Sequence, residues 1–572
     1  MTSTYDLLRA RLTAAFATVS PGSDPVLRLS ERSDYQANGV MAVAKSLGRP
    51  PRDVANDIVA AADLEGVARI EVAGPGFLNV TLLPALMDRQ LRDLVNDPRL
   101  GVVAAHPPTT VVIDYSSPNV AKEMHVGHLR STVIGDALAR LHRFAGHRVV
   151  ARNHVGDWGT PFGMLIEHLI DLGEDDATAS LSMGDLDSFY RAARTKFDGD
   201  DDFKVRSRAR VVALQGADPE TNRLWRILVD QSLAYFAEVY AKLDVDLTPE
   251  DVVGESHYND RLQGVVDDLA RAGLLVDSGG AWCVFPPGFT NREGEPLPLI
   301  VQKRDEGFGY AASDLAALRD RVEHLGANEM LYVVGAPQAQ HFEMVFAVAR
   351  LAGWLPASVR CEHVIFGNVL GPDRKMLKTR RGETIKLVSL LDDAVERAGQ
   401  VLDERRGALA GSARDELAVQ IARAAVKYAD LSTDRTRDYV FDLDRMITFE
   451  GDTGPYLQYA HARLRSILRR ADESGAANAV PFVLGHDAER HLALGILSFP
   501  EALDAALRTL QPHRLCNYLF DLAQRFTLFY EHCPVVQSSE PLRSERRALC
   551  ALTARTLDVG LSLLGIDAPD QM

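Results

Sequence analysis

Residues 111–128 read VVIDYSSPNVAKEMHVGH, and the order of apolar and polar residues in and after this stretch decides the fold. Residues 111–115 are typical of a buried strand, and residues 116–124 are typical of a loop. From about residue 126 to 144, apolar residues recur at roughly every third or fourth position, which predicts a helix. A second apolar stretch follows at residues 148–151. The sequence therefore predicts a β-α-β unit.

Two imidazoles, His125 and His128, stand at the first turn of this predicted helix. They are three residues apart, so they project to the same side of the helix. A helix N-terminus offers unpaired N–H groups and the positive end of the helix dipole, which together favour a phosphate. The pattern thus indicates a phosphate site without a glycine cradle. The alternatives are a polar first turn or a partial zinc site, although zinc would need two further ligands and no Cys lies nearby.

Length and composition limit the class of protein. A chain of 572 residues predicts three or four domains. The formal charge, 63 − 79 = −16, argues against nucleic-acid binding over the whole surface but is compatible with local basic grooves. Five scattered Cys without a Cys-x-x-Cys pair predict reduced, structural thiols. Because neither a secretory signal nor an apolar run of about 20 residues is found, we expect a cytoplasmic protein outside the membrane.

Hydrophobic periodicity divides the chain into three parts. A predicted helix at residues 5–17 and a hairpin around Gly74-Pro75-Gly76 indicate a small α+β domain over residues 1–108. Alternating strand-like and helical runs predict a parallel sheet within residues 109–388, with insertions at about 171–298. The strand-like runs are at residues 111–115, 149–153, 331–334 and 364–366. Residues 389–572 are predicted to be entirely helical.

Chemically suggestive side chains gather in three separate segments. The first supplies Asp114 at a strand end, then an amide, a lysine and the two histidines, and ligands of such sheets bind at the carboxyl ends of the strands. In the second, Tyr310 and Asp314 would share a helix face. Asp314 could bind a cation, or it could merely complement a helix dipole. The third, residues 374–381, holds five cations within eight residues and would stabilise a polyphosphate, unless it is an ordinary basic loop.

A predicted helix in the C-terminal third carries a second basic feature. Pro455 suits its first turn, and an apolar face runs from Tyr456 onward. His461, Arg465 and Arg469 fall on the opposite face. That face is either solvated or a phosphate-facing stripe for RNA.

Taken together, these segments resemble those of a known enzyme family. The histidine pair resembles the His-Ile-Gly-His signature of class I aminoacyl-tRNA synthetases, and Lys375-Met376-Leu377-Lys378-Thr379 resembles their Lys-Met-Ser-Lys-Ser loop. Five further segments narrow the resemblance to arginyl-tRNA synthetases and extend it over essentially the whole chain. They are residues 116–122 (SSPNVAK), 156–160 (GDWGT), 310–316 (YAASDLA), 338–342 (QAQHF) and 456–463 (YLQYAHAR).

The resemblance implies an α/β fold: a Rossmann-type class I catalytic core with insertions, a small α+β N-terminal domain that contacts the tRNA elbow, and an all-helical anticodon-binding domain. It implies ATP-dependent ligation of L-arginine to tRNA(Arg) through arginyl-adenylate, with transfer to the 2′-hydroxyl of the terminal adenosine. Mg²⁺ would enter with ATP, and we expect no structural zinc, no membrane partner and a monomer.

The family's functional residues carry over onto matching positions of this chain. The catalytic set would be His125, His128, Lys375 and Lys378. The ATP site would add Asn119, Lys122 and Gly127. The arginine pocket would be formed by Asp114, Asn119, Tyr310, Asp314 and Gln338, and tRNA would contact Tyr459, Arg465 and Arg469.

The chain departs from the family pattern in its second signature, where Leu377 follows Met376 in place of a serine. This leaves open which of Lys375 and Lys378 contacts phosphate. Two other functions compete with the synthetase. One is a nucleotidyltransferase that makes a free adenylate for another acceptor, and the other is a paralogue that uses tRNA or arginyl-adenylate for another purpose. The basic helix of the C-terminal third counts against the first, and the presence of both histidines and the carboxylates counts against a non-catalytic paralogue.

Overall fold

The computed structural model describes residues 2–30, 32–159, 161–174, 186–304, 307–377, 385–404, 411–472 and 481–572. At its centre lies a parallel sheet with the strand order β11-β10-β5-β6. The strands are β5 (Thr110–Asp114), β6 (Arg148–Arg152), β10 (Glu329–Tyr332) and β11 (Arg360–His363). Their last residues are in register, so the four carboxyl ends meet at one edge of the sheet.

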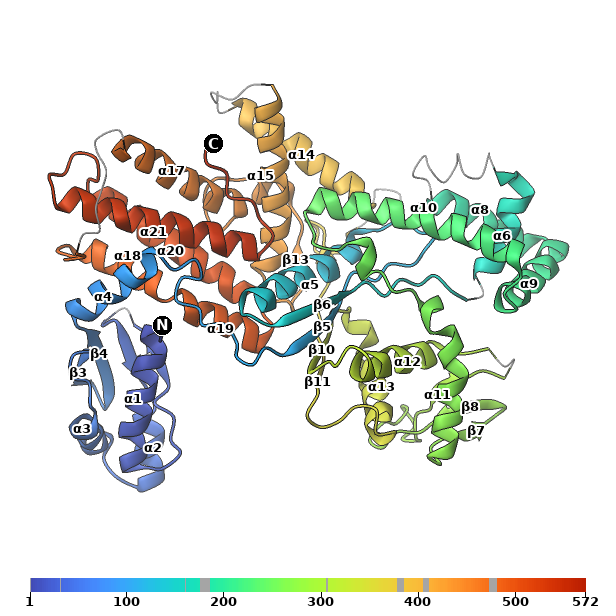
Figure 1. The fold of residues 1–572 in the computed structure, drawn as a ribbon, viewed down its shortest axis with the longest axis horizontal. Coiled ribbons are helices and arrows are strands. Elements are labelled where there is room, and N and C mark those ends of the chain that lie inside the picture. The colour runs from blue at the N-terminus through green and yellow to red at the C-terminus, as the bar shows by residue number, and fades with distance from the viewer. Residues whose placement is uncertain are drawn as a thin grey trace.

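Helix α5 (Val126–Phe144) connects β5 to β6 and confirms the predicted β-α-β unit. Most of its side chains are buried, including polar ones, because the sheet covers one side and α14 (Leu387–Glu404), α15 (Ser412–Leu431), α19 (Phe499–Thr509) and α21 (Leu542–Leu563) contact the other. Figure 1 shows α5 between the sheet and the helical C-terminal part. The helix that begins at the histidine pair is therefore enclosed by the central sheet and four helices.

The prediction of a strand at residues 364–366 is wrong, because the strand of this region lies directly before them. Strand β11 ends at His363. Beyond it the pairing is irregular: the Val364 N–H donates to the Tyr332 carbonyl at 2.8 Å, and Phe366 forms a single parallel bridge with Gly335. The apolar run is buried all the same, since Val364 and Phe366 pack into the core beneath the following loop. A buried loop requires the same apolar residues as a buried strand, so the sequence pattern alone does not distinguish the two.

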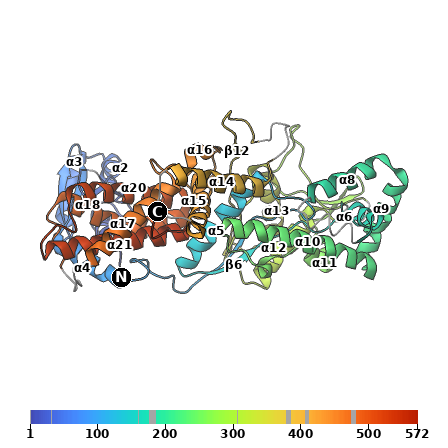
Figure 2. The same cartoon turned by 90° about the horizontal axis from the view of Figure 1, so that it is seen from above.

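Insertions follow β6 and separate it from α12 (Tyr310–Glu323), as the sequence predicted. A small antiparallel sheet, β7-β8-β9, ends this region. Figure 2 shows the insertion helices at one end of the molecule and the N-terminal domain at the other. The elements are α6 (Pro161–Leu172), α8 (Leu186–Gly199), α9 (Asp201–Gln215), α10 (Pro219–Leu243), η1 (Pro249–Asp251), η2 (Glu255–Tyr258), α11 (Asn259–Arg271), β7 (Val276–Ser278), β8 (Ala281–Val284) and β9 (Leu299–Gln302). Beyond α12, η3 (Ala336–Gln338) and α13 (Ala339–Leu351) connect β10 to β11.

The N-terminal domain has the predicted α+β character, with an antiparallel sheet of order β1-β2-β4-β3. The hairpin of β3 and β4 turns at the predicted glycines. Arg490 and Arg555 of the C-terminal helices bind Asp34 and the Val95 carbonyl, which fastens the domain to the helical part. Its elements are α1 (Thr4–Val19), β1 (Leu27–Leu29), β2 (Tyr35–Ala37), α2 (Val40–Leu47), α3 (Pro51–Ala61), β3 (Ala68–Ala73), β4 (Phe77–Leu82) and α4 (Pro84–Val95).

Among the residues after 388 that the structure describes, one short strand interrupts the helices. Strand β13 (Tyr439–Val440) pairs in parallel with β12 (Val369–Leu370), which precedes the basic segment. Besides α14, α15, α19 and α21, the helices are α16 (Leu443–Met446), α17 (Gly454–Asp472), α18 (Asp487–Leu497) and α20 (His513–His532). None of the helices in the described ranges is long and apolar enough to cross a membrane. The domain boundaries at residues 108 and 388 stay predictions.

Candidate active site

A cavity of about 670 Å³ opens at the N-terminal end of α5. Four segments line it: the loop before α5, the first turn of α5, the insertion helix α8, and the start of α14. Among the side chains predicted for ATP, Asn119, Lys122, His125 and His128 all line this cavity. Gly127 lies between the two histidines and is exposed.

Hydrogen bonds to the backbone determine which nitrogen of each histidine is free. His125 is the N-cap of α5, and its Nδ1 accepts the Gly127 N–H at 3.0 Å. The Nδ1 of His128 accepts the His125 N–H at 3.1 Å, which completes a capping box. Burial lowers the pKa of both rings, to about 3 for His128, so both are neutral at neutral pH. With Nδ1 acting as acceptor, each neutral ring carries its proton on Nε2 and can donate it to a ligand.

The loop between β5 and α5 is held in an unusual backbone conformation. Ser116, Ser117 and Ala121 have φ values of 70°, 47° and 60°, a region that costs free energy for residues other than glycine. Each of their N–H groups is bound by a distant side chain: Ser131 at 2.9 Å, Asn153 at 3.0 Å and Ser232 at 2.9 Å. These bonds stabilise a strained loop beside the cavity, a feature that is common at functional sites.

Asn119 lies against Gly156, the first residue of the segment 156–160 that contributed to the resemblance. Val120 donates to the Gly156 carbonyl at 3.0 Å, and Gly156 donates to the Pro118 carbonyl at 3.1 Å. A Cβ on Gly156 would lie 2.2 Å from Asn119 Oδ1, so only glycine leaves room for that amide. The fold therefore explains why the two segments occur together.

Asp114 is at the carboxyl end of β5, where it was predicted, but its carboxylate already has protein partners. Arg321 of α12 donates to it at 2.6 Å, and Ser117 donates to it at 2.8 Å. Both Asp114 and Arg321 are buried. The structure thus gives Asp114 an internal counter-charge, which the sequence reading did not anticipate.

Asp314 faces a different group of titratable side chains. Its Oδ2 lies 2.6 Å from His341 Nε2. Burial alone would lower the pKa of His341, but the hydrogen bond and the charge of Asp314 outweigh it and raise that pKa. Glu255, in the insertion, faces the same charge: burial, Asp314 and then Asp157 raise the pKa of Glu255 to about 8. An acidic cluster of Asp314, Glu255 and Asp157 therefore forms where α12 and η2 contact each other.

Asp157 connects this acidic cluster to the loop around Asn119. Its two carboxylate oxygens accept the N–H and the hydroxyl of Ser256, at 2.9 Å and 2.6 Å, and so hold the residue that follows Glu255. Asp157 itself follows Gly156, which pairs with Asn119. Residues 156–157 and 255–256 thus link the loop around Asn119 to the carboxyl group of Glu255, which senses the charge of Asp314.

Tyr310 and Gln338 lie at helix starts near the same edge of the sheet. Tyr310 begins α12 and is 74% exposed, and Gln338 is the exposed N-cap residue of α13. Within the part of the chain that the structure describes, neither side chain forms a hydrogen bond with Asp314, whose partner is His341. Their exposure leaves them accessible to a ligand.

Residues 385–387, which follow the third predicted segment, contact the first segment. Val126 donates to the Ile385 carbonyl at 3.1 Å, and Leu387 donates to the Met124 carbonyl at 2.9 Å. In the same place, Lys386 pairs with Glu123 at 2.9 Å. Lys375 is exposed in a turn after β12, where its N–H donates to Asp373, and Lys378 lies outside the described residues. The chain that leaves the basic segment is therefore hydrogen-bonded to the start of α5.

The predicted basic face of α17 is only partly exposed. Arg465 binds the Asp570 carboxylate at 2.8 Å, and Arg469 donates to the Asp570 carbonyl at 3.1 Å. His461 is buried, with Nδ1 3.0 Å from the Pro569 carbonyl, so both interpretations of this face, as solvated and as facing RNA, are wrong at that position. The segment after α21 covers it. Tyr459 is 40% exposed and remains accessible.

Sequence reasoning missed three members of the site: Glu255, Arg321 and His341. His341 stood within the quoted residues 338–342, so its segment was found although its role was not. Glu255 and Arg321 belong to stretches without a distinctive spacing, and their partners are far away in sequence. Among the described residues, no cluster of three or more His, Cys, Asp and Glu side chains could hold a metal ion.

Comparison with known proteins agrees with this geometry. Three family profiles match: "tRNA synthetases class I (R), catalytic domain" over residues 90–443, "DALR anticodon binding domain" over 457–572, and "Arginyl tRNA synthetase N terminal domain" over 6–82. An arginine–tRNA ligase of Thermobifida fusca is 52% identical over 99% of this chain and 98% of its own length. One from Cellvibrio japonicus is 47% identical over 99% of both chains.

Solved structures extend the agreement to the fold. The crystal structure of arginyl-tRNA synthetase from Plasmodium falciparum has a TM-score of 0.85 and 28% identity, with full coverage of both chains. The Thermus thermophilus arginyl-tRNA synthetase has a TM-score of 0.79 and 25% identity over 99% of this chain and 100% of that one. A class I catalytic core, an N-terminal domain and a helical C-terminal domain are thus shared over the full length. The chain belongs to the arginyl-tRNA synthetase family of class I aminoacyl-tRNA synthetases.

Proposed function

We propose that this chain ligates L-arginine to tRNA(Arg) at the expense of ATP, through an arginyl-adenylate. The observation that carries the proposal is the pair of neutral histidines at the start of α5. Each has its Nδ1 bound by a backbone N–H, which leaves an Nε2–H donor beside a cavity of about 670 Å³. Relatives that share nearly the whole length of the chain are arginine–tRNA ligases, and this supports the same reaction here.

In the first step, the arginine carboxylate attacks the α-phosphate of ATP, the new C–O–P link forms, and pyrophosphate leaves. The protein contributes positioning and charge stabilisation. His125 and His128 donate to phosphate oxygens, and the N-terminal end of α5, including the Gly127 region, adds its dipole. Lys122, Lys375 and Lys378 neutralise the remaining charge, with Mg²⁺ entering as part of the ATP substrate. Asn119 lies at the border between the two substrates.

Arginine recognition rests on carboxylates that match a forked cation. A guanidinium presents planar paired donors that a carboxylate accepts together, whereas lysine offers a single ammonium. Asp314 is the primary partner, and Glu255 is a second one that ionises when the cation arrives. Tyr310 and Gln338 complete the wall. Asp114 contributes indirectly: its carboxylate binds the Arg321 guanidinium at 2.6 Å and so holds α12 in place.

In the second step, the 2′-hydroxyl of the terminal adenosine of tRNA attacks the adenylate carbonyl and AMP leaves. The C-terminal helices hold the anticodon through Tyr459, Arg465 and Arg469. The two arginines exchange their contacts with Asp570 for phosphates, because the surface ion pair of Arg465 is weak and Arg469 donates only to the Asp570 carbonyl. We also propose a monomer that works in the cytoplasm.

Charging of total tRNA with labelled arginine tests the proposal directly. We expect arginine-, ATP- and tRNA-dependent label in tRNA, and none with labelled lysine. His128→Ala should lower kcat by about 10²–10³, the usual effect of removing one preorganised donor. His324→Ala is the matched control, because this ring is 64% exposed at the far end of α12. Adenylate formation without any charged tRNA would contradict the ligase and favour a paralogue with another acceptor.

A further inference from the structure

Two buried ion pairs of opposite polarity join α5 to α15. Arg130 of α5 lies 3.3 Å from Asp430, and Asp136 of α5 lies 3.7 Å from Lys427. All four side chains are at most 1% exposed. Helix α15 belongs to the helical C-terminal third, whereas the first turn of α5 lines the candidate ATP cavity. The two parts of the molecule are therefore held together by charge as well as by packing.

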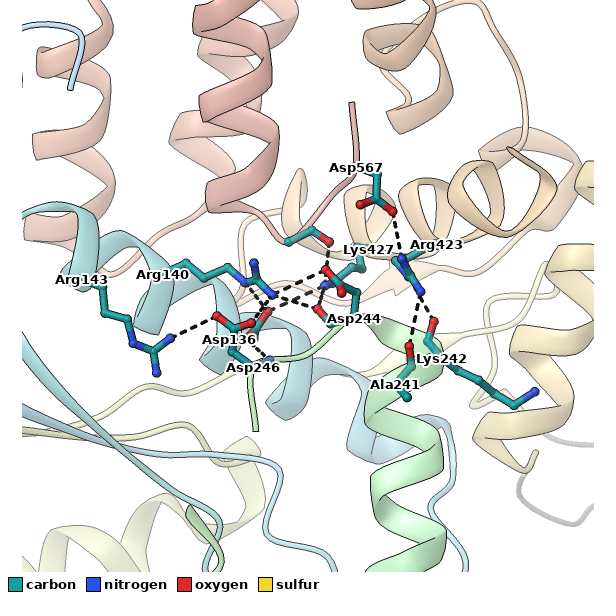
Figure 3. A network of polar contacts seen from close by, with 11 residues as sticks. Asp136, Arg140, Arg143, Ala241, Lys242, Asp244, Asp246, Arg423, Lys427 and Asp567 are labelled. Atoms are coloured by element: carbon teal, nitrogen blue, oxygen red, sulfur yellow. Dashed lines mark hydrogen bonds and ion pairs between the residues drawn. The ribbon is translucent and has the colours of Figure 1, made fainter. Parts of the chain in front are cut away.

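Lys427 connects three separate segments through one ammonium group. Its Nζ donates to the Asp244 carbonyl at the end of α10 at 2.9 Å, and to the Gly565 carbonyl after α21 at 2.8 Å. The third neighbour is the carboxylate of Asp136. Figure 3 shows Lys427 beside Asp136 and Asp244. Because a buried ammonium needs all of its partners, it favours the single arrangement in which the three segments meet.

Asp136 is bound from its other side by the segment that follows α10. The Asp246 N–H donates to one of its oxygens at 3.0 Å, and Arg140 Nε donates to the other at 2.9 Å. Arg140 also reaches the Asp246 carboxylate at 2.9 Å (Figure 3). Asp136 is thus contacted by the insertion through Asp246 and by α15 through Lys427, which also binds the segment after α21.

The segment after α21, residues 565–570, is itself tied to α15 and α17. Asp567 accepts from Arg423 of α15 at 2.9 Å, and its carbonyl accepts from Gln458 of α17 at 2.9 Å. Arg423 further donates to the carbonyls of Lys242 and Ala241 at the end of α10. Helix α17 is therefore linked to α5 by three polar contacts: Gln458 with the Asp567 carbonyl, Lys427 with the Gly565 carbonyl, and Lys427 with Asp136.

We propose that Lys427 is a positioning residue for the aminoacylation reaction: by holding Asp136, it sets the place of α5 and so of the phosphate-binding histidines at its start. The proposal rests on the proposed function of that helix end. About eight residues separate His128 from Asp136, or roughly 12 Å along the helix axis, so a tilt or slide at Asp136 is carried to the first turn. A misplacement of about 1 Å near the reacting atoms typically costs around 100-fold in rate.

Gly565 provides a perturbation aimed at this contact alone. Its φ is 66°, and a Cβ there would lie 2.3 Å from Lys427 Nζ and 3.0 Å from Asp136 Oδ2. Gly565→Ala should therefore displace the ammonium. Gly326→Ala is the matched control, since Gly326 has a φ of 65° and open space around its Cβ position. The two substitutions share the backbone strain, and only one of them presses on Lys427.

The test measures kcat and the KM of ATP and arginine in tRNA charging, with rates normalised to active sites. We expect Gly565→Ala to lower kcat about tenfold or more with each KM within about threefold, and Gly326→Ala to change kcat less than twofold, because loss of transition-state positioning lowers kcat and kcat/KM together. Lys427→Met should reproduce the loss in kcat, and Lys427→Arg should restore part of it.

Several outcomes would overturn the proposal. Equal kcat values for Gly565→Ala and Gly326→Ala would do so, as would a Lys427→Met enzyme that melts earlier but turns over like the wild type. If Lys427→Met does not fold, the glycine pair decides the question by itself. Wild-type enzyme that fails to charge tRNA would instead refute the proposed function, so the two failures are distinguishable.

Discussion

Replacing Asp314 by Asn tests the arginine pocket most sharply, because it removes one charge while nearly preserving shape. Hydrogen bonds to charged groups contribute about 1.5–3 kcal/mol, which corresponds to roughly 10- to 150-fold in the KM for arginine. The KM for ATP should change little, since Asp314 is not among the residues that line the cavity at the start of α5. The substitution also affects two neighbours, His341 at 2.6 Å and Glu255.

Glu255 should partly compensate for the lost charge, and this gives the prediction a pH signature. In the wild-type enzyme the pKa of Glu255 is raised to about 8 by burial and by the charges of Asp314 and Asp157. Below that pH the free enzyme holds a protonated Glu255, and binding a guanidinium must release the proton. The apparent affinity for arginine therefore rises with pH and levels off above about pH 8. Without the charge of Asp314, the pKa of Glu255 falls and the break moves to lower pH.

The assay is the KM for arginine in pyrophosphate exchange with tRNA present, measured across this pH range for four enzymes. These are the wild type, Asp314→Asn, Glu255→Gln and the double variant. Glu255→Gln should lose the break near pH 8 but keep any titration of His341, and the double variant should bind arginine more weakly than either single one. An unchanged KM in Asp314→Asn, or a pH break that stays in place, would refute the assignment of these carboxylates.

Three further predictions concern other parts of the site. His128→Ala should lower kcat by about 10²–10³ while the melting temperature stays close to that of the wild type, and a wild-type turnover would remove the ring from the transition state. Gly156→Ala should push on the Asn119 amide, 2.2 Å from the new Cβ, and reduce kcat/KM for both small substrates at least tenfold; a fully active variant would mean that the amide can move without loss. Asp570→Asn should free Arg465 and tighten tRNA binding in filter-binding assays at low salt, whereas weaker binding would show that the ion pair itself shapes the tRNA surface.

Several features of the fold were predictable because their causes are local. The periodicity after residue 126 and the hairpin glycines at 74 and 76 act over a few residues, and the structure confirms the helix, the hairpin and the parallel sheet. The strand predicted at residues 364–366 failed because burial of a loop selects the same side chains as burial of a strand. Helical spacing placed the C-terminal arginines on one face. No pattern in the sequence near His461 indicated that residues 569–570 would cover it.

From the sequence alone came the family, the helix that starts at the histidine pair and the three segments that carry the chemistry. These depend on residue identity and on spacings of three or four positions. Only the tertiary structure decided that Asp114 forms an ion pair with Arg321, 207 residues away, and that Glu255 faces the charge of Asp314. It alone placed Lys427 between the segment after α21 and the middle of α5. The physical reason is that the charge state of a buried group depends on which distant groups share its low-dielectric surroundings, and packing brings those groups together.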